Sequence, residues 1–348
     1  MTATLSDTQP ASATNGTNAT SAAGVTNAAD VTNAADVTNA ADVTNAIALP
    51  PGMHVLERGW LSSNNIVFQD AQRAVIVDTG YCSHAEQTLQ LVRHVLQDRP
   101  LDAIYNTHLH SDHCGGNHIL QQHYPAVRTH VPVAEMPRLQ DWSRMQLSFD
   151  ATGQRCDPFH AEAVVKPGDR IDLGGMTWEA LYAPGHHPYC YLLFCPEHRI
   201  LISADALWEK GFGVVFPALD GYGGFDEVRA TLDMIDDLSP ALVIPGHGKP
   251  FTNVKQALKE AYSRVAYLEA DPARNAQNGI KVLLKFLLME RQEIPLAEVP
   301  RLLQRIPLVK AANRNFLNFG DIHLAHWAVT QLQRAGAATI ERHLLVNL

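Results

Sequence analysis

The chain carries the segment Thr107-His108-Leu109-His110-Ser111-Asp112-His113-Cys114-Gly115-Gly116-Asn117 directly after a strongly apolar stretch. Three histidines and one aspartate fall within six positions of this segment. Imidazole nitrogens and a carboxylate are the ligands that zinc and similar divalent metals prefer. The spacing is too tight for one face of a helix or strand, so we expect a strand end that runs into a turn and brings the four side chains to one point. The segment is therefore interpreted as half of a metal site.

Three further candidate ligands stand where predicted strands end in turns. His186 follows a Pro-Gly turn, Asp205 follows the apolar run 201–204, and His247 follows a second Pro-Gly pair. With the first segment they make seven candidates, five histidines and two aspartates. Seven ligands exceed the need of one tetrahedral zinc but suit two metals that share a bridging carboxylate.

Apolar periodicity predicts a mixed α/β protein. The unit 74–106 is predicted as strand, helix and strand, which places the histidine-rich segment at the carboxyl end of the second strand. Catalytic groups of α/β sheets collect at that end. Strands are expected at 65–68, 74–77, 101–106, 170–173, 177–182, 189–194, 200–203 and 241–244, and helices at 83–97, 115–122, 133–145 and 225–238.

The composition divides the chain into three parts. Residues 1–49 are rich in Ala, Thr, Asn and Ser and repeat VTNAAD from Val25, so we expect a disordered tail. Residues 50–252 hold every candidate ligand. Residues 253–348 are predicted as a small helical region, with helices at 254–269, 280–291, 296–304 and 322–335 and one final strand at 338–341.

Charge and cysteine content narrow the function classes. No apolar run is long enough to cross a bilayer, and the net charge of −9 argues against nucleic acid as the main substrate. The five cysteines form no CxxC pair, and the chain shows no secretory signal. We therefore expect a cytoplasmic protein with reduced thiols that acts on a small molecule, with no membrane partner and with its oligomeric state open.

The elements His108-x-His110-x-Asp112-His113, Gly185-His186, Asp205 and Gly246-His247 resemble the metallo-β-lactamase superfamily of hydrolases over about residues 53–250. The resemblance implies a four-layer αββα sandwich with its metal site along one edge of two sheets. The helical C-terminal region is weakly similar to the winged-helix-like tail of several family members.

The resemblance also implies roles for the ligands. His108, His110 and His186 would hold one divalent metal, and Asp112, His113 and His247 a second, with Asp205 bridging. Zinc is expected, with iron or manganese as alternatives. Asp112 would also orient a metal-bound hydroxide and handle a proton. Asp78 would orient ligands near the site; its alternative role, capping backbone N–H groups at a strand end, stays open.

Ligand identity favours one branch of the family. True zinc β-lactamases usually carry Cys or another non-bridging group where this chain has Asp205, so the chain looks more like glyoxalase II, lactonases and related ester or thioester hydrolases. His110 stands where flavodiiron oxygen reductases carry glutamate. His187 could replace His186 as a ligand or contact the substrate. Tyr189 and Tyr222 are further candidates for substrate binding.

Four functions are weighed on these observations. The first is a dinuclear metal-dependent hydrolase of an ester, thioester or lactone. The second is a single-iron persulfide dioxygenase, whose metal ligands are a subset of the seven. A nuclease of the RNase Z or β-CASP type and a non-catalytic module on this fold are the third and fourth. The acidic composition disfavours the nuclease, and the complete ligand set disfavours the non-catalytic module.

Overall fold

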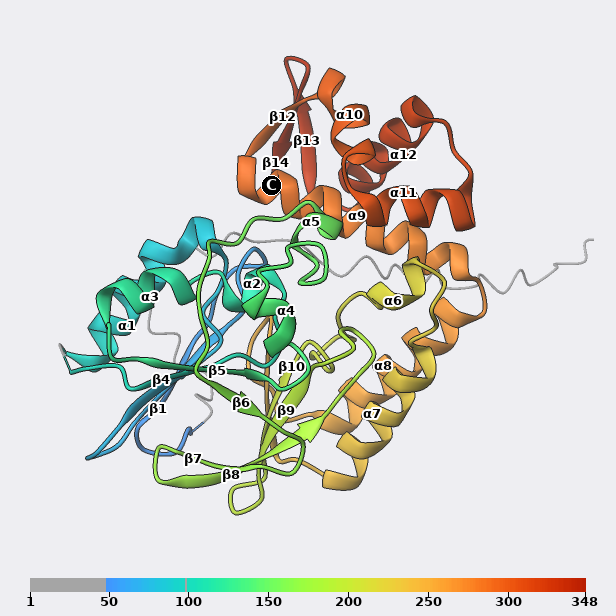
Figure 1. The fold of residues 1–348 in the computed structure, drawn as a ribbon. Coiled ribbons are helices and arrows are strands. Elements are labelled where there is room, and N and C mark those ends of the chain that lie inside the picture. The colour runs from blue at the N-terminus through green and yellow to red at the C-terminus, as the bar shows by residue number, and fades with distance from the viewer. Residues whose placement is uncertain (1–47, 98) are drawn as a thin grey trace, which may run out of the picture.

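The computed structural model describes residues 48–97 and 99–348 (Figure 1). The predicted disordered tail, with its VTNAAD repeats, lies outside the described residues except for its last two positions. Within the described ranges, no helix combines the length and the apolar character that a bilayer crossing requires.

Two sheets form the centre of the molecule. In the first, β1 to β3 run antiparallel and β3 to β6 run parallel, in the order β1-β2-β3-β4-β5-β6. In the second, β10 and β11 run parallel and the other neighbours antiparallel, in the order β11-β10-β9-β8-β7. The strands are β1 Met53–Leu56, β2 Asn65–Gln69, β3 Ala74–Val77, β4 Ala103–Tyr105, β5 Arg128–Pro132, β6 Ala163–Val165, β7 Arg170–Leu173, β8 Met176–Tyr182, β9 Tyr191–Cys195, β10 Ile200–Ala204 and β11 Leu242–Pro245.

Alternation along the strands produces a core between the sheets and a core on each outer face. In β3, Val75 and Val77 belong to the core between the sheets, whereas Ile76 packs with the helices outside. In β10, Ile202 faces inward and Leu201 faces the opposite helices. A strand buried on both faces reads as a continuous apolar run, which is why these strands were easy to find in the sequence.

Helices cover both outer faces of the sandwich. Leucines and valines of α1 and α3 pack on the first sheet, and those of α7 and α8 pack on the second. The predicted four-layer αββα architecture is therefore confirmed. The helices and turns up to this point are η1 Cys82–His84, α1 Ala85–Leu96, α2 Ser111–Cys114, α3 Asn117–His123, α4 Met136–Gln140, α5 Phe149–Thr152, α6 Phe216–Leu219, α7 Phe225–Leu238 and α8 Val254–Glu269.

The C-terminal region forms a lobe above the sandwich, drawn in orange and red in Figure 1. It has its own apolar core, and a three-stranded sheet in the order β12-β14-β13 accompanies its helices. Its elements are α9 Pro272–Arg291, β12 Glu293–Pro295, η2 Leu296–Glu298, α10 Val299–Gln304, α11 Pro307–Ala312, the π-helical turn η3 Asn313–Leu317, α12 Asp321–Arg334, β13 Ala338–Glu341 and β14 Leu344–Asn347.

Several boundaries differ from the sequence prediction. The helix expected at 133–145 is reduced to α4, because the backbone N–H of Val133 donates to Val165 as a continuation of the sheet and Trp142 adopts a positive φ of 44°. Helix α9 begins eight residues before the predicted start, where Asp271 accepts a capping hydrogen bond from Ala273 N. The hairpin β13–β14 turns at Arg342 and His343, both at positive φ without a glycine, so it gave no turn signal.

Candidate metal centre

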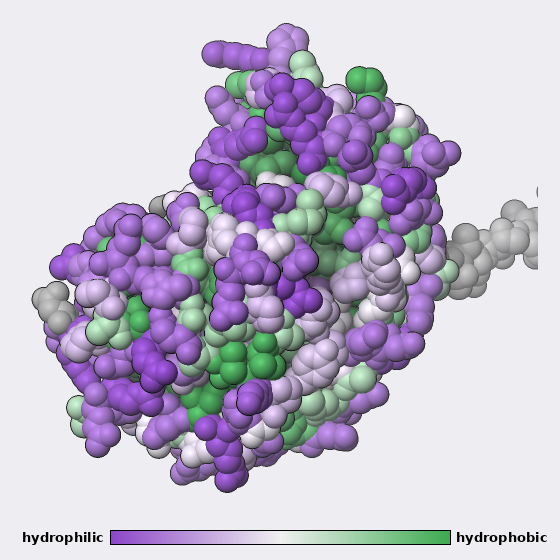
Figure 2. Space-filling model, viewed as in Figure 1, coloured by the Kyte–Doolittle hydropathy of each residue, from purple (hydrophilic) through white to green (hydrophobic). Residues whose placement is uncertain are grey.

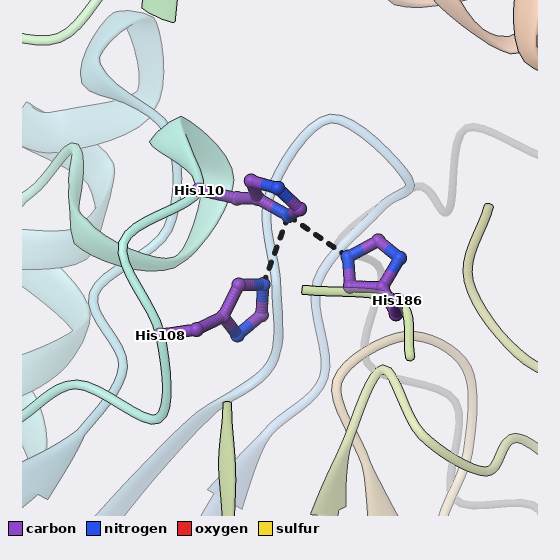
Figure 3. A group of neighbouring side chains, drawn as sticks. All are labelled: His108, His110 and His186. Carbon is purple, nitrogen blue, oxygen red and sulfur yellow. Dashed lines mark hydrogen bonds between the residues drawn. The ribbon is translucent and has the colours of Figure 1, made fainter. Parts of the chain in front are cut away.

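Three buried histidines converge at the edge of the two sheets (Figure 3). His108 and His110 lie in the loop after β4, and His186 lies in the loop after β8. The Nδ1 atom of His110 is 3.0 Å from His108 Nε2 and 2.8 Å from His186 Nε2. Two nitrogen ligands of one tetrahedral zinc lie roughly 3.3 Å apart. The three nitrogens are therefore spaced as a metal ion would require.

The electrostatics of this group favour neutral imidazoles. Burial, and then the neighbouring histidines, hold the pKa of His108 and His110 well below the ordinary value, and burial lowers the pKa of His186 to about 4. Neutral imidazole is the form that coordinates a metal. The three side chains can therefore offer lone pairs without first losing a proton at neutral pH.

Hydrogen bonds fix which nitrogen of each ring is available. His186 donates from Nδ1 to the carbonyl oxygen of Val214 at 2.7 Å, which leaves its Nε2 lone pair free. His108 Nδ1 lies 3.1 Å from Thr107 Oγ1, and that hydroxyl in turn donates to Asp78. Partners of this kind set the tautomer and orientation of a metal-binding histidine.

A second group consists of Asp112, His113 and His247, whose ligand atoms lie within 4.8 Å of one another. His247 Nε2 is 3.2 Å from Asp112 Oδ2. His113 Nε2 is fully buried and has no hydrogen-bond partner among the described residues. A buried nitrogen without a partner is costly unless something binds there. This orphaned nitrogen fits the place of a metal ligand.

Asp205 lies between the two groups. Its Oδ1 atom is 3.5 Å from His113 Nε2 and 3.8 Å from His247 Nε2, and its Oδ2 atom is 3.3 Å from His186 Nε2. Burial alone would raise the pKa of this carboxyl, but His113, His247 and His186 hold it well below its ordinary value. One ionised carboxylate thus faces both groups, as a bridging ligand would.

Asp78 connects the first sheet to the second group. It is 2% exposed and accepts hydrogen bonds from His113 Nδ1 at 2.7 Å, Thr107 N at 2.9 Å and Thr107 Oγ1 at 2.8 Å. Burial lowers the pKa of His113, but the carboxylates of Asp78 and Asp205 outweigh burial and raise it. Asp78 thus contacts both a candidate ligand and a backbone N–H.

Two glycines allow the close approach of these side chains. A Cβ atom at Gly246 would lie 2.3 Å from Asp205 Oδ1, and one at Gly213 would lie 2.3 Å from His186 Nδ1. Contacts this short do not occur for real Cβ atoms. The Gly246-His247 pair in the sequence therefore has a steric reason, whereas Gly213 carried no signal that sequence reasoning could use.

The structure places the other predicted site residues outside the converging group. His187 is buried beside His108 and His110, and its Nε2 lies 3.0 Å from Glu135 Oε1. The hydroxyl of Tyr189 accepts a hydrogen bond of 2.6 Å from Arg138. Tyr222 is 83% exposed. None of the three lines the cavity described next, and their roles in substrate binding stay predictions.

A cavity of about 130 Å³ opens onto the two groups. Candidate ligands from both groups line it, together with aromatic residues that the sequence did not single out, among them Trp60, Trp208 and Phe216. Trp60 stacks on His247 with ring centres 5.4 Å apart, and Trp208 Nε1 donates to Asp205 Oδ1 at 3.2 Å. The lone tryptophans lie in loops and match no motif, so only the folded structure reveals them.

The chain belongs to the metallo-beta-lactamase superfamily. Residues 58–247, more than half of the chain, match the model of that family. The matched range contains every candidate ligand from His108 to His247.

Curated relatives point to one activity within the family. The chain is 27% identical over 210 residues to a hydroxyacylglutathione hydrolase of Synechococcus sp. (strain JA-2-3B'a(2-13)), covering 59% of this chain and 72% of that one. It is 30% identical over 151 residues to a hydroxyacylglutathione hydrolase of Stenotrophomonas maltophilia, covering 43% and 48%. Across the first relatives, the chain spans between 54% and 72% of their length.

Solved structures agree on the fold. A metallo-beta-lactamase family protein from Thermus thermophilus superposes with a TM-score of 0.52 at 19% identity, covering 86% of this chain and all of that one. A beta-lactamase domain protein from Burkholderia ambifaria gives a TM-score of 0.51 at 19% identity, with coverage of 88% and 97%. Both likenesses extend beyond the family-matched range and therefore include part of the C-terminal region.

Proposed function

We propose that this chain is a metal-dependent hydrolase that holds two divalent metal ions, zinc in the first instance, and cleaves an ester, thioester or lactone bond of a small molecule. The observation that carries this proposal is the position of Asp205, whose two carboxylate oxygens face two separate groups of ligand atoms. The family match and the hydroxyacylglutathione hydrolase names of the curated relatives support the hydrolase class.

The proposed ligand sets follow the two groups. His108, His110 and His186 would hold one metal, and Asp112, His113 and His247 the other, with Asp205 shared. Metal ions in such a site supply a nucleophile from water near neutral pH and polarise the bond under attack. His186 stands in place of His187 because its Nε2 faces His110, whereas His187 faces Glu135.

Residues of the chain itself would orient the reactants. The Asp112 side chain is 14% exposed and lines the cavity, so it can contact a bound substrate or water and accept a proton. Trp60 and Trp208 form aromatic walls beside His247 and exclude water from that side. The small, largely apolar cavity favours a small-molecule substrate over a polymer.

Elemental analysis of the purified protein, coupled to hydrolysis assays, tests the proposal. Two metals per chain and turnover of an ester, thioester or lactone are expected, with no turnover of phosphodiesters. The variant Asp205→Ala should lose one metal and most activity, whereas Asp172→Ala, at an exposed position on β7, should lose neither. A chain that binds no metal while folded contradicts the proposal. One iron per chain with oxygen uptake would instead support the persulfide dioxygenase.

A further inference from the structure

The cavity that meets the metal-binding groups has a second polar lining. Arg264 of α8 and two residues of α9, Asn278 and Lys281, face the same cavity as His110 and Asp112. Figure 2 shows hydrophobic residues recessed between the C-terminal lobe and the sandwich. Phe212, Phe216 and Phe286 are among the cavity's apolar lining.

The two cations have no acidic partner among the described residues. The guanidinium of Arg264 lies over the ring of Phe212, 5.5 Å from its centre, and its Nε is buried without a hydrogen-bond partner. Burial, and then the charge of Arg264, lower the pKa of Lys281, and no carboxylate among the described residues offsets them. Two like charges that are partly desolvated and uncompensated destabilise the unliganded protein.

The third polar group points to the same kind of ligand. Asn278 has a buried Nδ2 with no partner in the described part of the chain, and this atom is a hydrogen-bond donor. Lys285 also lines the cavity, but its ammonium already donates to Ala337 O, Asn347 Oδ1 and Leu348 O at 2.6 to 2.9 Å. Lys285 is thus committed to the C-terminal sheet, while the free groups are all donors.

We propose that Arg264, Lys281 and Asn278 form a subsite for an anionic group of the substrate, a carboxylate or a phosphate, which an apolar spacer joins to the bond cleaved at the metal centre. The proposal rests on the proposed function, since it names the class of molecule that the hydrolase would accept. An anionic oxygen accepts from every free donor of the subsite and compensates both charges. Arginine suits this role because its planar fork matches carboxylate and phosphate oxygens.

Matched substrates test the subsite. Thioesters would be made in sets that end in a carboxylate, a phosphate or a neutral amide, with the terminal group on the acyl part in one series and on the thiol part in another. A charge-assisted hydrogen bond predicts about a 10- to 100-fold higher kcat/KM for an anionic member than for its neutral partner. The carboxylate and phosphate arms show which anion the site takes.

Variants separate a specific contact from a general effect. Lys281→Met should reduce the preference for the anionic member by about tenfold, mainly through KM, and Lys281→Arg should restore most of it. Arg264→Met should act in the same direction. Lys259→Met removes a charge from an exposed position on α8 outside the cavity, and it should leave both rates and the preference unchanged.

The outcomes distinguish this inference from the proposed function. If the metal-loaded protein hydrolyses the anionic and neutral members of both series equally well, the subsite is wrong and the hydrolase stands. If it hydrolyses no thioester, ester or lactone, the proposed function is wrong. The subsite is then measured by calorimetry with the corresponding thioethers: tighter binding of the anionic thioether that Lys281→Met abolishes supports it, and equal binding refutes it.

Discussion

Replacement of Asp78 by asparagine should remove one metal and leave the other. Oδ2 of Asp78 receives two donors, His113 Nδ1 and the Thr107 hydroxyl, while Oδ1 receives Thr107 N. In Asp78→Asn, the amide oxygen can still accept from the backbone, but the amide NH₂ then faces both remaining donors. His113 would respond by moving its proton from Nδ1 to Nε2, the atom that the second metal needs.

The size of this effect follows from the role of such partners. Loss of the carboxylate behind a metal-binding histidine costs about 10- to 100-fold in metal affinity, or about 1.4 to 2.7 kcal/mol. Titration with a competing chelator, followed by elemental analysis, should show one weakened site and one site within about threefold of the wild-type affinity. The retained site would be the one formed by His108, His110 and His186.

A matched control uses another aspartate that accepts a backbone hydrogen bond at a strand end. Asp102 Oδ2 accepts from Ala74 N at 2.7 Å and contacts no candidate ligand among the described residues. Asp102→Asn should bind both metals normally. If Asp78→Asn also binds both with wild-type affinity, while its melting temperature shows an intact fold, the tautomer argument is refuted.

Three further predictions concern sterics, pH and the core. Gly213→Ala should displace His186 and lower activity on the order of 100-fold, because the new Cβ would lie 2.3 Å from His186 Nδ1, whereas Gly59→Ala, with open space around it, should retain full activity in the same assay. Burial, with Arg128 and Arg73, lowers the pKa of His130 to about 4, so the unfolded chain takes up this proton more readily. The stability that results is present above about pH 6.5 and is lost as the pH falls towards 4. Urea unfolding at both pH values should show that His130→Phe loses about 1–2 kcal/mol less than the wild type, a figure reduced for the partly exposed ring; equal losses would contradict the assignment. Trp178→Ala should lower the free energy of unfolding by about 3–5 kcal/mol, since Trp178 is fully buried against Phe68, while the exposed Thr177→Ala should change it by less than about 0.5 kcal/mol.

The sequence was sufficient for the sandwich and for the set of candidate ligands. Strands such as β3 and β10 are buried on both faces and therefore read as unbroken apolar runs. Tight segments that follow such strands must lie at the carboxyl edge, so the convergence of His108, His186 and Asp205 was predictable in outline. Strand β5, in contrast, was missed because it contains Arg128 and His130.

The lining of the cavity was not predictable in the same way. Trp60 and Trp208 come from loops, and their contacts with His247 depend on tertiary packing rather than on any local period. Arg264 and Lys281 lie on different helices, so no cluster of charge appears in the sequence. Both features arise only when α8 and α9 are placed against the edge of the sandwich.

The ligands come from both sheets, and this origin makes metal concentration a determinant of folding. His108 to His113 follow β4 of the first sheet, and Asp205 and His247 follow β10 and β11 of the second. Ions bound between them would join the two halves, and separating the sheets would require releasing those ions. At a free metal concentration 100 times the dissociation constant, each site would add about 2.7 kcal/mol to the free energy of unfolding. Metal supply would then regulate how long the folded chain persists, independently of any substrate.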